Sequence, residues 1–166
     1  TLDNGADYRF QTDATAECVE RRCGILRIPT GGGKTEIAIG LSRVLPCRWL
    51  FLVPGKDLLE NARRRFKRLT GLTAGKIGDG SFDVREPFTV ATFDTLSRRL
   101  KKRDPATLEL LQTWAQGIVV DECHTLPAAS FYAVAMETRA AYYRIGISAT
   151  PLARSDRKSV FAIAAL

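Results

Sequence analysis

The chain has 166 residues, 45% of them hydrophobic, and its 25 Lys and Arg against 18 Asp and Glu give a formal net charge of +7. This composition excludes a disordered chain and predicts one globular domain with a real core. The basic excess favours a polyanionic partner such as nucleic acid. Because no apolar run approaches the ~20 residues that span a bilayer, no membrane partner is expected.

The first predicted elements are a helix over residues 13–22, capped by Thr12 or Asp13, and a short apolar strand over residues 24–28. The helix contains Cys18, and the strand follows Cys23. These and the other two cysteines show no paired metal-ligand spacing, and with a single histidine in the chain a zinc site is not expected. We expect reduced thiols and an intracellular, reducing location, either the cytoplasm or the nucleoid or nucleus.

A glycine loop follows the first strand, because residues 29–35 read Pro-Thr-Gly-Gly-Gly-Lys-Thr. Glycine lets backbone N–H groups approach a polyphosphate closely, and the N-terminus of the next helix adds partial positive charge. Lys34 can reach the β- and γ-phosphates, and the Thr35 hydroxyl can bind Mg²⁺. The alternative is a glycine-rich turn with a chance lysine. We expect nucleotide phosphates to bind to Thr30, Gly31, Gly32, Gly33, Lys34 and Thr35.

The helix after the loop is predicted to bury a stripe that includes Ile37, Leu41 and Val44. Residues 48–53 then form a continuous apolar run, typical of a strand buried on both faces of a parallel sheet. The next helix has a predicted inner face that includes Leu58 and Phe66. Its outer face is basic over residues 63–68, and a second basic run covers residues 97–103. Each run is either a solvated face or a source of non-specific affinity for nucleic acid.

The second half of the chain continues the alternation of strands and helices. Strands are expected near residues 76–77 and at 88–91, 117–122 and 142–147, and helices at 94–103, 105–115 and 130–138. This order favours an α/β fold with an open, mostly parallel sheet and helices on both faces.

Two acids, Asp121 and Glu122, end one of the predicted strands. Ligands of an open parallel sheet bind beyond the carboxyl ends of the strands, where the glycine loop, these acids and residues 148–150 would meet. Asp121 can hold Mg²⁺ through water, opposite the Thr35 hydroxyl, and Glu122 can orient or deprotonate an attacking water. The alternative is a strand-end turn with solvated acids.

The motifs and their order resemble those of superfamily 2 helicases and translocases. Residues 29–35 are similar to motif I, residues 121–124 (Asp-Glu-Cys-His) to the DExH form of motif II, and residues 148–150 (Ser-Ala-Thr) to motif III. Residues 51–56 and 90–96 resemble motifs Ia and Ib. Residues 75–80 and 145–151 resemble the DNA-acting branch of this superfamily, which contains type III restriction subunits, XPB-like translocases and phage recombination helicases. The resemblance implies a RecA-like P-loop fold.

At the nucleotide, the resemblance implies that Gln11 reads the adenine and that Phe10 stacks nearby; otherwise Gln11 is a polar residue at a helix start. His124 would couple the ATP site to the nucleic-acid site through Ser148 and Thr150. The alternatives are a histidine that merely packs and a Ser/Thr turn before a proline.

For nucleic acid, the resemblance implies backbone contacts at Gly55, Lys56 and Thr92, beside two helix N-termini. It also implies that residues 1–166 form a single RecA-like, ATP-binding lobe, and that a second lobe supplies an arginine to the transition state.

We therefore expect a helicase or translocase that uses ATP and Mg²⁺, with nucleic acid as its partner and DNA favoured over RNA. Lys34, Asp121 and Glu122 would serve hydrolysis, which is expected to be weak in this lobe alone. The open alternatives are another P-loop enzyme, such as a kinase or small-molecule ATPase, and a binding platform without motor activity.

Overall fold

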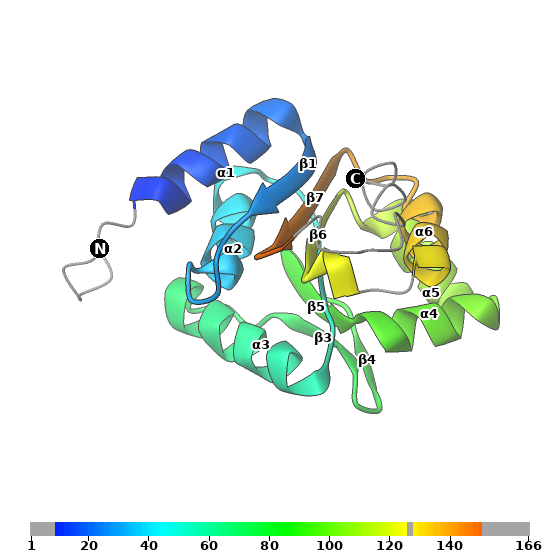
Figure 1. The fold of residues 1–166 in the computed structure, drawn as a ribbon. Coiled ribbons are helices and arrows are strands. Elements are labelled where there is room, and N and C mark those ends of the chain that lie inside the picture. The colour runs from blue at the N-terminus through cyan, green and yellow to red at the C-terminus, as the bar shows by residue number, and fades with distance from the viewer. Residues whose placement is uncertain (1–8, 126–127, 151–166) are drawn as a thin grey trace.

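The computed structural model describes residues 9–125 and 128–150. It contains a seven-stranded sheet with helices on both faces (Figure 1). In chain order the elements are α1 (Arg9–Arg21), β1 (Cys23–Arg27), α2 (Lys34–Val44), β2 (Trp49–Val53), α3 (Lys56–Thr70), β3 (Gly75–Gly78), β4 (Ser81–Asp83), β5 (Phe88–Thr92), α4 (Phe93–Lys101), α5 (Pro105–Glu109), the π-helix η1 (Leu110–Trp114), β6 (Gly117–Asp121), the 3₁₀-helix η2 (Cys123–Thr125), α6 (Ala128–Glu137) and β7 (Tyr143–Ser148).

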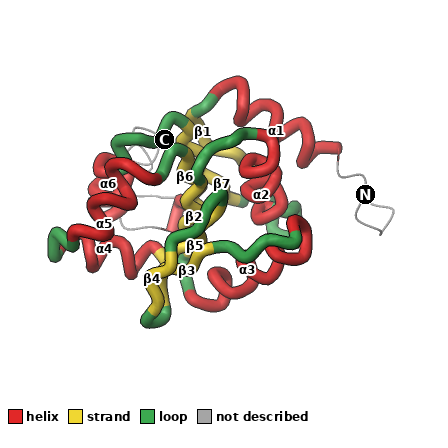
Figure 2. The backbone as a smooth tube through the Cα atoms, turned by 180° about the vertical axis from the view of Figure 1, so that it is seen from behind, coloured by secondary structure: helices red, strands yellow, loops and turns green. Residues whose placement is uncertain are grey.

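The strand order is β1-β7-β6-β2-β5-β3-β4, and all neighbours are parallel except the β3–β4 pair. Helices α1, α2 and α3 cover one face of the sheet, and α4, α5 and α6 cover the other (Figures 1 and 2). The α/β fold predicted from the alternation of elements is therefore confirmed.

Strand β2 shows why the sequence forms this three-layer arrangement. All five of its residues are buried, and successive side chains of a strand point to opposite faces. Phe51 packs in the apolar cluster under α1, α2 and α3, whereas Leu50 and Leu52 pack in the cluster under α4, α5 and α6. An uninterrupted apolar run is thus required by a sheet covered on both sides.

Several local features differ from the predictions. Leu58, predicted for the inner face of its helix, is 42% exposed, because Leu59 rather than Leu58 is buried against the sheet. Helix α1 begins at Arg9, so Thr12 and Asp13 lie inside it and do not cap it; its first turn packs on the glycine loop, and this tertiary contact overrides the local cap signal. Val44 is 61% exposed, because α2 ends there and the next residue is extended. Strand β3 also pairs with the short strand β4, which the sequence analysis did not predict.

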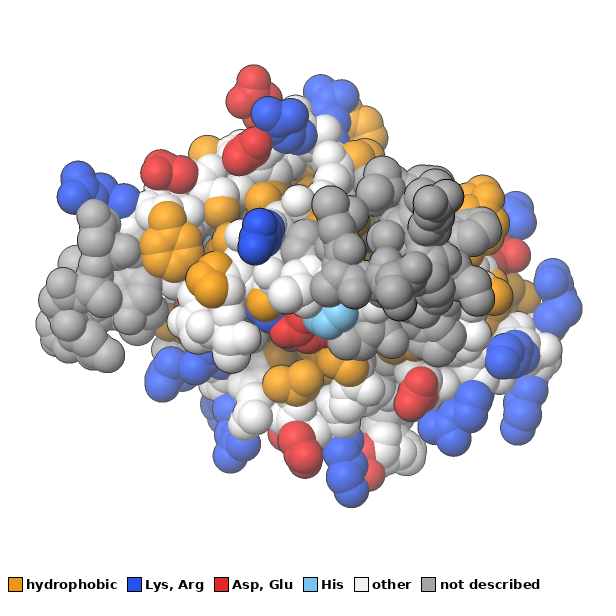
Figure 3. Space-filling view, viewed as in Figure 1, with side chains coloured by type: hydrophobic (Ala, Val, Ile, Leu, Met, Phe, Trp, Pro, Cys, Tyr) orange, Lys and Arg blue, Asp and Glu red, His pale blue; other side chains and the backbone are white. Residues whose placement is uncertain are grey.

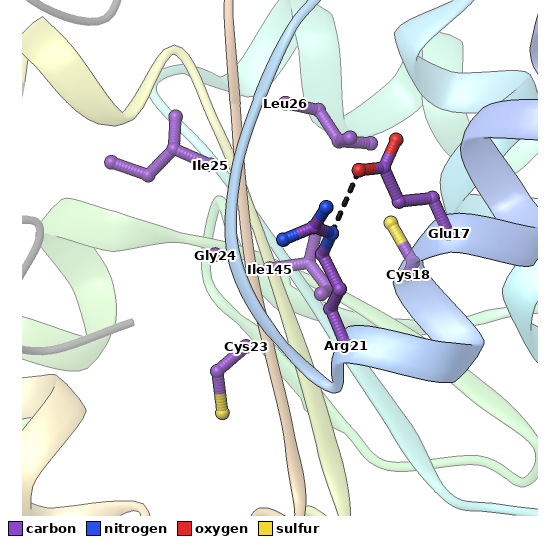
Figure 4. A pocket seen from close by; sticks show the side chains of 8 residues that line it. All are labelled: Glu17, Cys18, Arg21, Cys23, Gly24, Ile25, Leu26 and Ile145. Atoms are coloured by element: carbon purple, nitrogen blue, oxygen red, sulfur yellow. Dashed lines mark ion pairs between the residues drawn. The ribbon is translucent and has the colours of Figure 1, made fainter.

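The cysteines are free thiols, as expected. Burial raises the pKa of the Cys18 thiol to about 12. Figure 4 shows Cys18 and Cys23 beside a pocket between α1 and β1, with their side chains pointing away from each other. In the part of the chain that the structure describes, no helix is long and apolar enough to cross a membrane.

Candidate active site

Three predicted motifs lie at the carboxyl ends of three adjacent strands. The glycine loop follows β1, Ser148 ends β7, and Asp121 ends β6, and these strands are neighbours in the sheet. Arg27 pairs with Ser148 in register, and Asp121 pairs with Ile147. The parallel sheet therefore brings the motifs together at one edge, as the sequence predicted.

The glycine loop turns tightly before α2. The Gly32 N–H donates to the Pro29 carbonyl at 3.0 Å, and the Ile37 N–H donates to the Gly33 carbonyl at 3.0 Å. Gly33 has a φ of 81°, and a Cβ at this position would lie 2.1 Å from Gln11 Nε2. The positive φ favours glycine, and a side chain here would also displace the Gln11 amide from the loop. The loop thus places exposed backbone at the N-terminus of an 11-residue helix.

Lys34 forms an ion pair with Glu122, between Nζ and Oε1. This contact joins the first residue of α2 to the acid that follows β6, 88 positions later in the chain. Asp121 is only 7% exposed, and burial, followed by repulsion from Glu122, raises the pKa of its carboxyl against the opposing attraction of Lys34. Figure 3 shows the pale-blue histidine of this chain next to red acidic side chains near the middle of the face.

His124 connects the acids to the end of β7. Its Nδ1 lies 2.6 Å from Ser148 Oγ and 3.3 Å from Glu122 Oε2. The Thr150 N–H donates to the same Ser148 hydroxyl at 3.1 Å. Glu122 itself has a φ of 48°, a left-handed conformation that is uncommon for a residue with a side chain. The structure therefore brings together the three residues predicted to couple the sites.

Gln11 lies against the glycine loop. Its Nε2 donates to the Gly32 carbonyl at 3.3 Å, so the amide is held beside the predicted phosphate site. Phe10, one residue earlier, is 41% exposed and presents an open ring surface. Both residues belong to the first turn of α1.

Thr35 is placed differently from Lys34. Within the described residues its hydroxyl makes no hydrogen bond. It lies at the end of a cavity of about 550 Å³ that runs along α3 and is lined by Thr35, Leu58, Asn61, Arg64, Arg65 and Arg68. Arg65, one of these residues, forms an ion pair with Glu36 that was not predicted. The acid directly after Lys34 and Thr35 signals that some cation must compensate it, because this loop otherwise favours anions, but it does not identify Arg65 as the partner.

The residues predicted to contact nucleic acid lie at the same sheet edge, farther along. Gly55 and Lys56 begin α3 after β2, and Thr92 immediately precedes α4 after β5. Strands β2 and β5 are adjacent, with Val53 opposite Thr92. The Thr92 side chain is buried, and its hydroxyl donates to Thr95 Oγ1 at 2.7 Å. Basic side chains gather near α3 and near α4 on the face seen in Figure 3.

Among the residues that the structure describes, no group of three or more His, Cys, Asp and Glu side chains is arranged to hold a metal ion alone. Mg²⁺ at nucleotide sites uses one or two protein carboxylates, with phosphates and water completing its octahedron. A buried Asp121 near the glycine loop, with the Thr35 hydroxyl at the end of that loop, fits such a site.

Comparisons with known proteins agree with this arrangement. The family model described as type III restriction enzyme, res subunit, matches residues 7–153. The DNA 3'-5' translocase XPB2 of Sulfurisphaera tokodaii is 30% identical over 149 residues, which cover 90% of this chain and 31% of that protein. The putative DNA 3'-5' helicase Rad25 of Halobacterium salinarum is 30% identical over 165 residues, which cover 95% of this chain and 26% of that protein.

A solved structure has the same fold. The crystal structure of the Hef helicase domain of Pyrococcus furiosus matches with a TM-score of 0.76 and 25% identity, covering 95% of this chain and 35% of that one. The chain thus spans about a third or less of the length of these relatives. Because the family model matches most of the sequence, this chain belongs to the family of the type III restriction enzyme res subunit.

Proposed function

We propose that this chain is the ATP-binding first RecA-like lobe of a superfamily 2 helicase or translocase that acts on DNA. The observation that carries the proposal is the Lys34–Glu122 ion pair, because it joins the glycine loop to the acids at one sheet edge. The names of XPB2 and Rad25, which describe a DNA translocase and a putative DNA helicase, support DNA over RNA.

In the proposed reaction the loop N–H groups and the N-terminus of α2 hold the phosphates of ATP. Lys34 turns from Glu122 toward the β- and γ-phosphates, and this movement leaves the Glu122 carboxylate to orient or deprotonate the attacking water. Thr35 and Asp121 would hold Mg²⁺, which neutralises charge on the phosphates. Gln11 would then leave the Gly32 carbonyl for the adenine, with Phe10 beside the ring.

The remaining assignments concern the whole protein. His124, Ser148 and Thr150 would transmit the nucleotide state toward the nucleic-acid site, and Gly55, Lys56 and the first turn of α4 after Thr92 would contact the DNA backbone. A second RecA-like lobe would complete the ATP site. We also propose an intracellular, reducing location, the cytoplasm or the nucleoid or nucleus.

Titration of the chain with a fluorescent ATP analogue and Mg²⁺ tests the nucleotide site. Lys34→Ala is expected to weaken binding at least ~10-fold, because it removes the cation that faces the phosphates. Lys76→Ala is the matched control, since it breaks a lysine–glutamate ion pair between β3 and α3, and four strands separate β3 from β1 in the sheet. Unchanged affinity in Lys34→Ala would refute the assignment. Glu122→Gln is expected to keep ATP bound while slowing its hydrolysis.

A second measurement separates the motor from other P-loop enzymes. In a protein that carries both lobes, DNA is expected to raise the rate of ATP hydrolysis. If neither DNA nor RNA changes the rate of ATP hydrolysis, but the rate depends on a small phosphoryl acceptor, the protein would instead be a kinase.

A further inference from the structure

The first turn of α2 carries an acid in a place that should repel phosphate. Glu36 directly follows Thr35, and a Cβ placed on Gly33 would lie 3.3 Å from Glu36 Oε2. The side chain is 11% exposed, and Oε2 is buried without a hydrogen-bond partner among the described residues. A mostly buried carboxylate therefore lies against the loop that we propose for triphosphate.

Arg65 compensates this charge. Its Nη1 lies 2.8 Å from Glu36 Oε1, and the arginine is 44% exposed where it reaches across from α3. A buried carboxylate is costly unless a cation pairs with it. The cost rises when a triphosphate binds nearby, because like charges in a partly desolvated site repel each other strongly.

The other arginines of the cavity do not have this contact. Arg64 Nη2 donates to Asn61 Oδ1 at 2.6 Å on the same helix. Arg68 has neither an ion pair nor a hydrogen bond within the described ranges 9–125 and 128–150. Both line the cavity with Arg65, so they provide a natural comparison: similar charge and location, without a carboxylate beside the glycine loop.

We propose that Arg65 is a positioning residue of the nucleotide site, which acts by neutralising and holding Glu36 against the phosphate-binding loop. The inference rests on the proposed function, because it needs a triphosphate at that loop. Arg65 contacts no nucleotide itself. Its effect passes through Glu36, so removing the Glu36 charge removes the need for Arg65.

A double-mutant cycle on the 166-residue chain tests this, with the dissociation constant of a fluorescent ATP analogue in the presence of Mg²⁺ as readout. Arg65→Ala is expected to weaken binding by about fivefold, as for one partly screened charge. Arg65→Lys is expected to restore most of the affinity, and Arg68→Ala to leave it unchanged. Glu36→Gln is expected to bind at least as tightly as the original chain.

The decisive variant is the combination of Glu36→Gln with Arg65→Ala. We expect affinity within about twofold of the original chain, because neither charge is left. A fivefold loss that persists in the Glu36→Gln background would mean that Arg65 acts independently of Glu36, through packing or through the phosphates themselves, and would overturn the inference. Should alanine lower the melting temperature, Arg65→Gln keeps the length and polarity of the side chain and serves in its place.

The remaining outcomes separate the inference from the proposed function. If the original chain binds the nucleotide and Arg65→Ala binds it equally well, the inference is wrong and the proposed function stands. If the original chain binds no nucleotide, both are wrong.

Discussion

The two adjacent carboxyl groups at the end of β6 lie in different electrostatic environments. Glu122 pairs with Lys34 and lies near His124, whereas Asp121 is buried, and burial raises the pKa of its carboxyl. Its Oδ1 accepts the Glu122 N–H at 3.0 Å, which only partly offsets the loss of water. Of the two acids, Asp121, which we assign to Mg²⁺, is thus the one whose ionised carboxylate is less stabilised by the ligand-free fold.

This difference predicts a pH-dependent gain in stability from Asp121→Asn. Because the folded-state pKa lies above the unfolded one, ionisation of Asp121 opposes folding; the penalty is absent below the ordinary pKa of 3.8 and appears as the pH rises through the folded value. Without metal or nucleotide, we expect Asp121→Asn to raise the free energy of unfolding at pH 7 by about 1 kcal/mol. Urea denaturation in EDTA should show the gain shrinking toward pH 4.

Glu122→Gln is the control for this experiment. It breaks the ion pair with Lys34, so it is expected to lower the free energy of unfolding at pH 7. An Asp121→Asn protein that is less stable than the original chain at pH 7 would contradict the burial argument.

At the scale of elements, the start of α5 depends on one carboxylate. Asp104 Oδ2 accepts hydrogen bonds from the Thr107 hydroxyl at 2.7 Å, the Thr107 N–H at 2.9 Å and Arg99 Nη2 at 2.8 Å. Asp104 therefore caps α5, with Pro105 in the first helical position. Through its contact with Arg99 it also connects α4 to α5, on the face of the sheet opposite α2.

Loss of this cap is expected to lower stability without affecting the site. We expect Asp104→Ala to reduce the melting temperature by about 2–4 °C, as for a lost N-cap in a domain of this size. The Thr107 hydroxyl, then its N–H, and Arg99 lower the pKa of the Asp104 carboxyl. The ionised cap therefore contributes above the ordinary value of 3.8, and its contribution is lost as the pH falls through the lower folded value.

Thermal melts of Asp104→Ala, Asp104→Asn and the original chain at neutral and acid pH check this. The asparagine variant should keep part of the cap and lose the pH dependence. Equal melting temperatures for Asp104→Ala and the original chain would show that the packing of α5 alone sets its start.

The elements differed in how far their sequence revealed them. The break between α4 and α5 was predictable, because Asp104-Pro105 is a strong helix start. The β3–β4 hairpin was equally readable: Asp79 and Gly80 have φ values of 50° and 77°, the conformation of an Asp-Gly hairpin turn, but the sequence analysis gave it no second strand. The π-helix after Glu109 could not be predicted, since the sequence of Leu110–Trp114 has the composition of an ordinary α-helix.

For the whole molecule, the fold and the meeting of the motifs were predictable because the carboxyl ends of parallel strands always share one edge. The side-chain partners at that edge were not. Lys34 and Glu122 are 88 positions apart, and spacing along the chain does not decide which acid a lysine selects. Glu36 with Arg65 was missed for the same reason, since the pair depends on how α2 and α3 lie across the sheet.

The whole-molecule arrangement leads to the last prediction, which concerns turnover. The described residues bring a glycine loop, two acids and a histidine to one sheet edge, whereas the proposed motor takes its transition-state arginine from a second lobe. The 166-residue chain is therefore expected to bind ATP but to hydrolyse it ~10³–10⁵-fold more slowly than a protein with both lobes, the factor that such an arginine contributes.

A steady-state ATPase assay with Mg²⁺, with and without DNA, measures this directly. Lys34→Ala serves as the blank, because a contaminating enzyme would give the same turnover with and without this substitution. Turnover above this blank that equals the rate of a two-lobe relative would mean that the acids and lysine of this edge suffice for catalysis, so the arginine of a second lobe would have no necessary part in the chemical step.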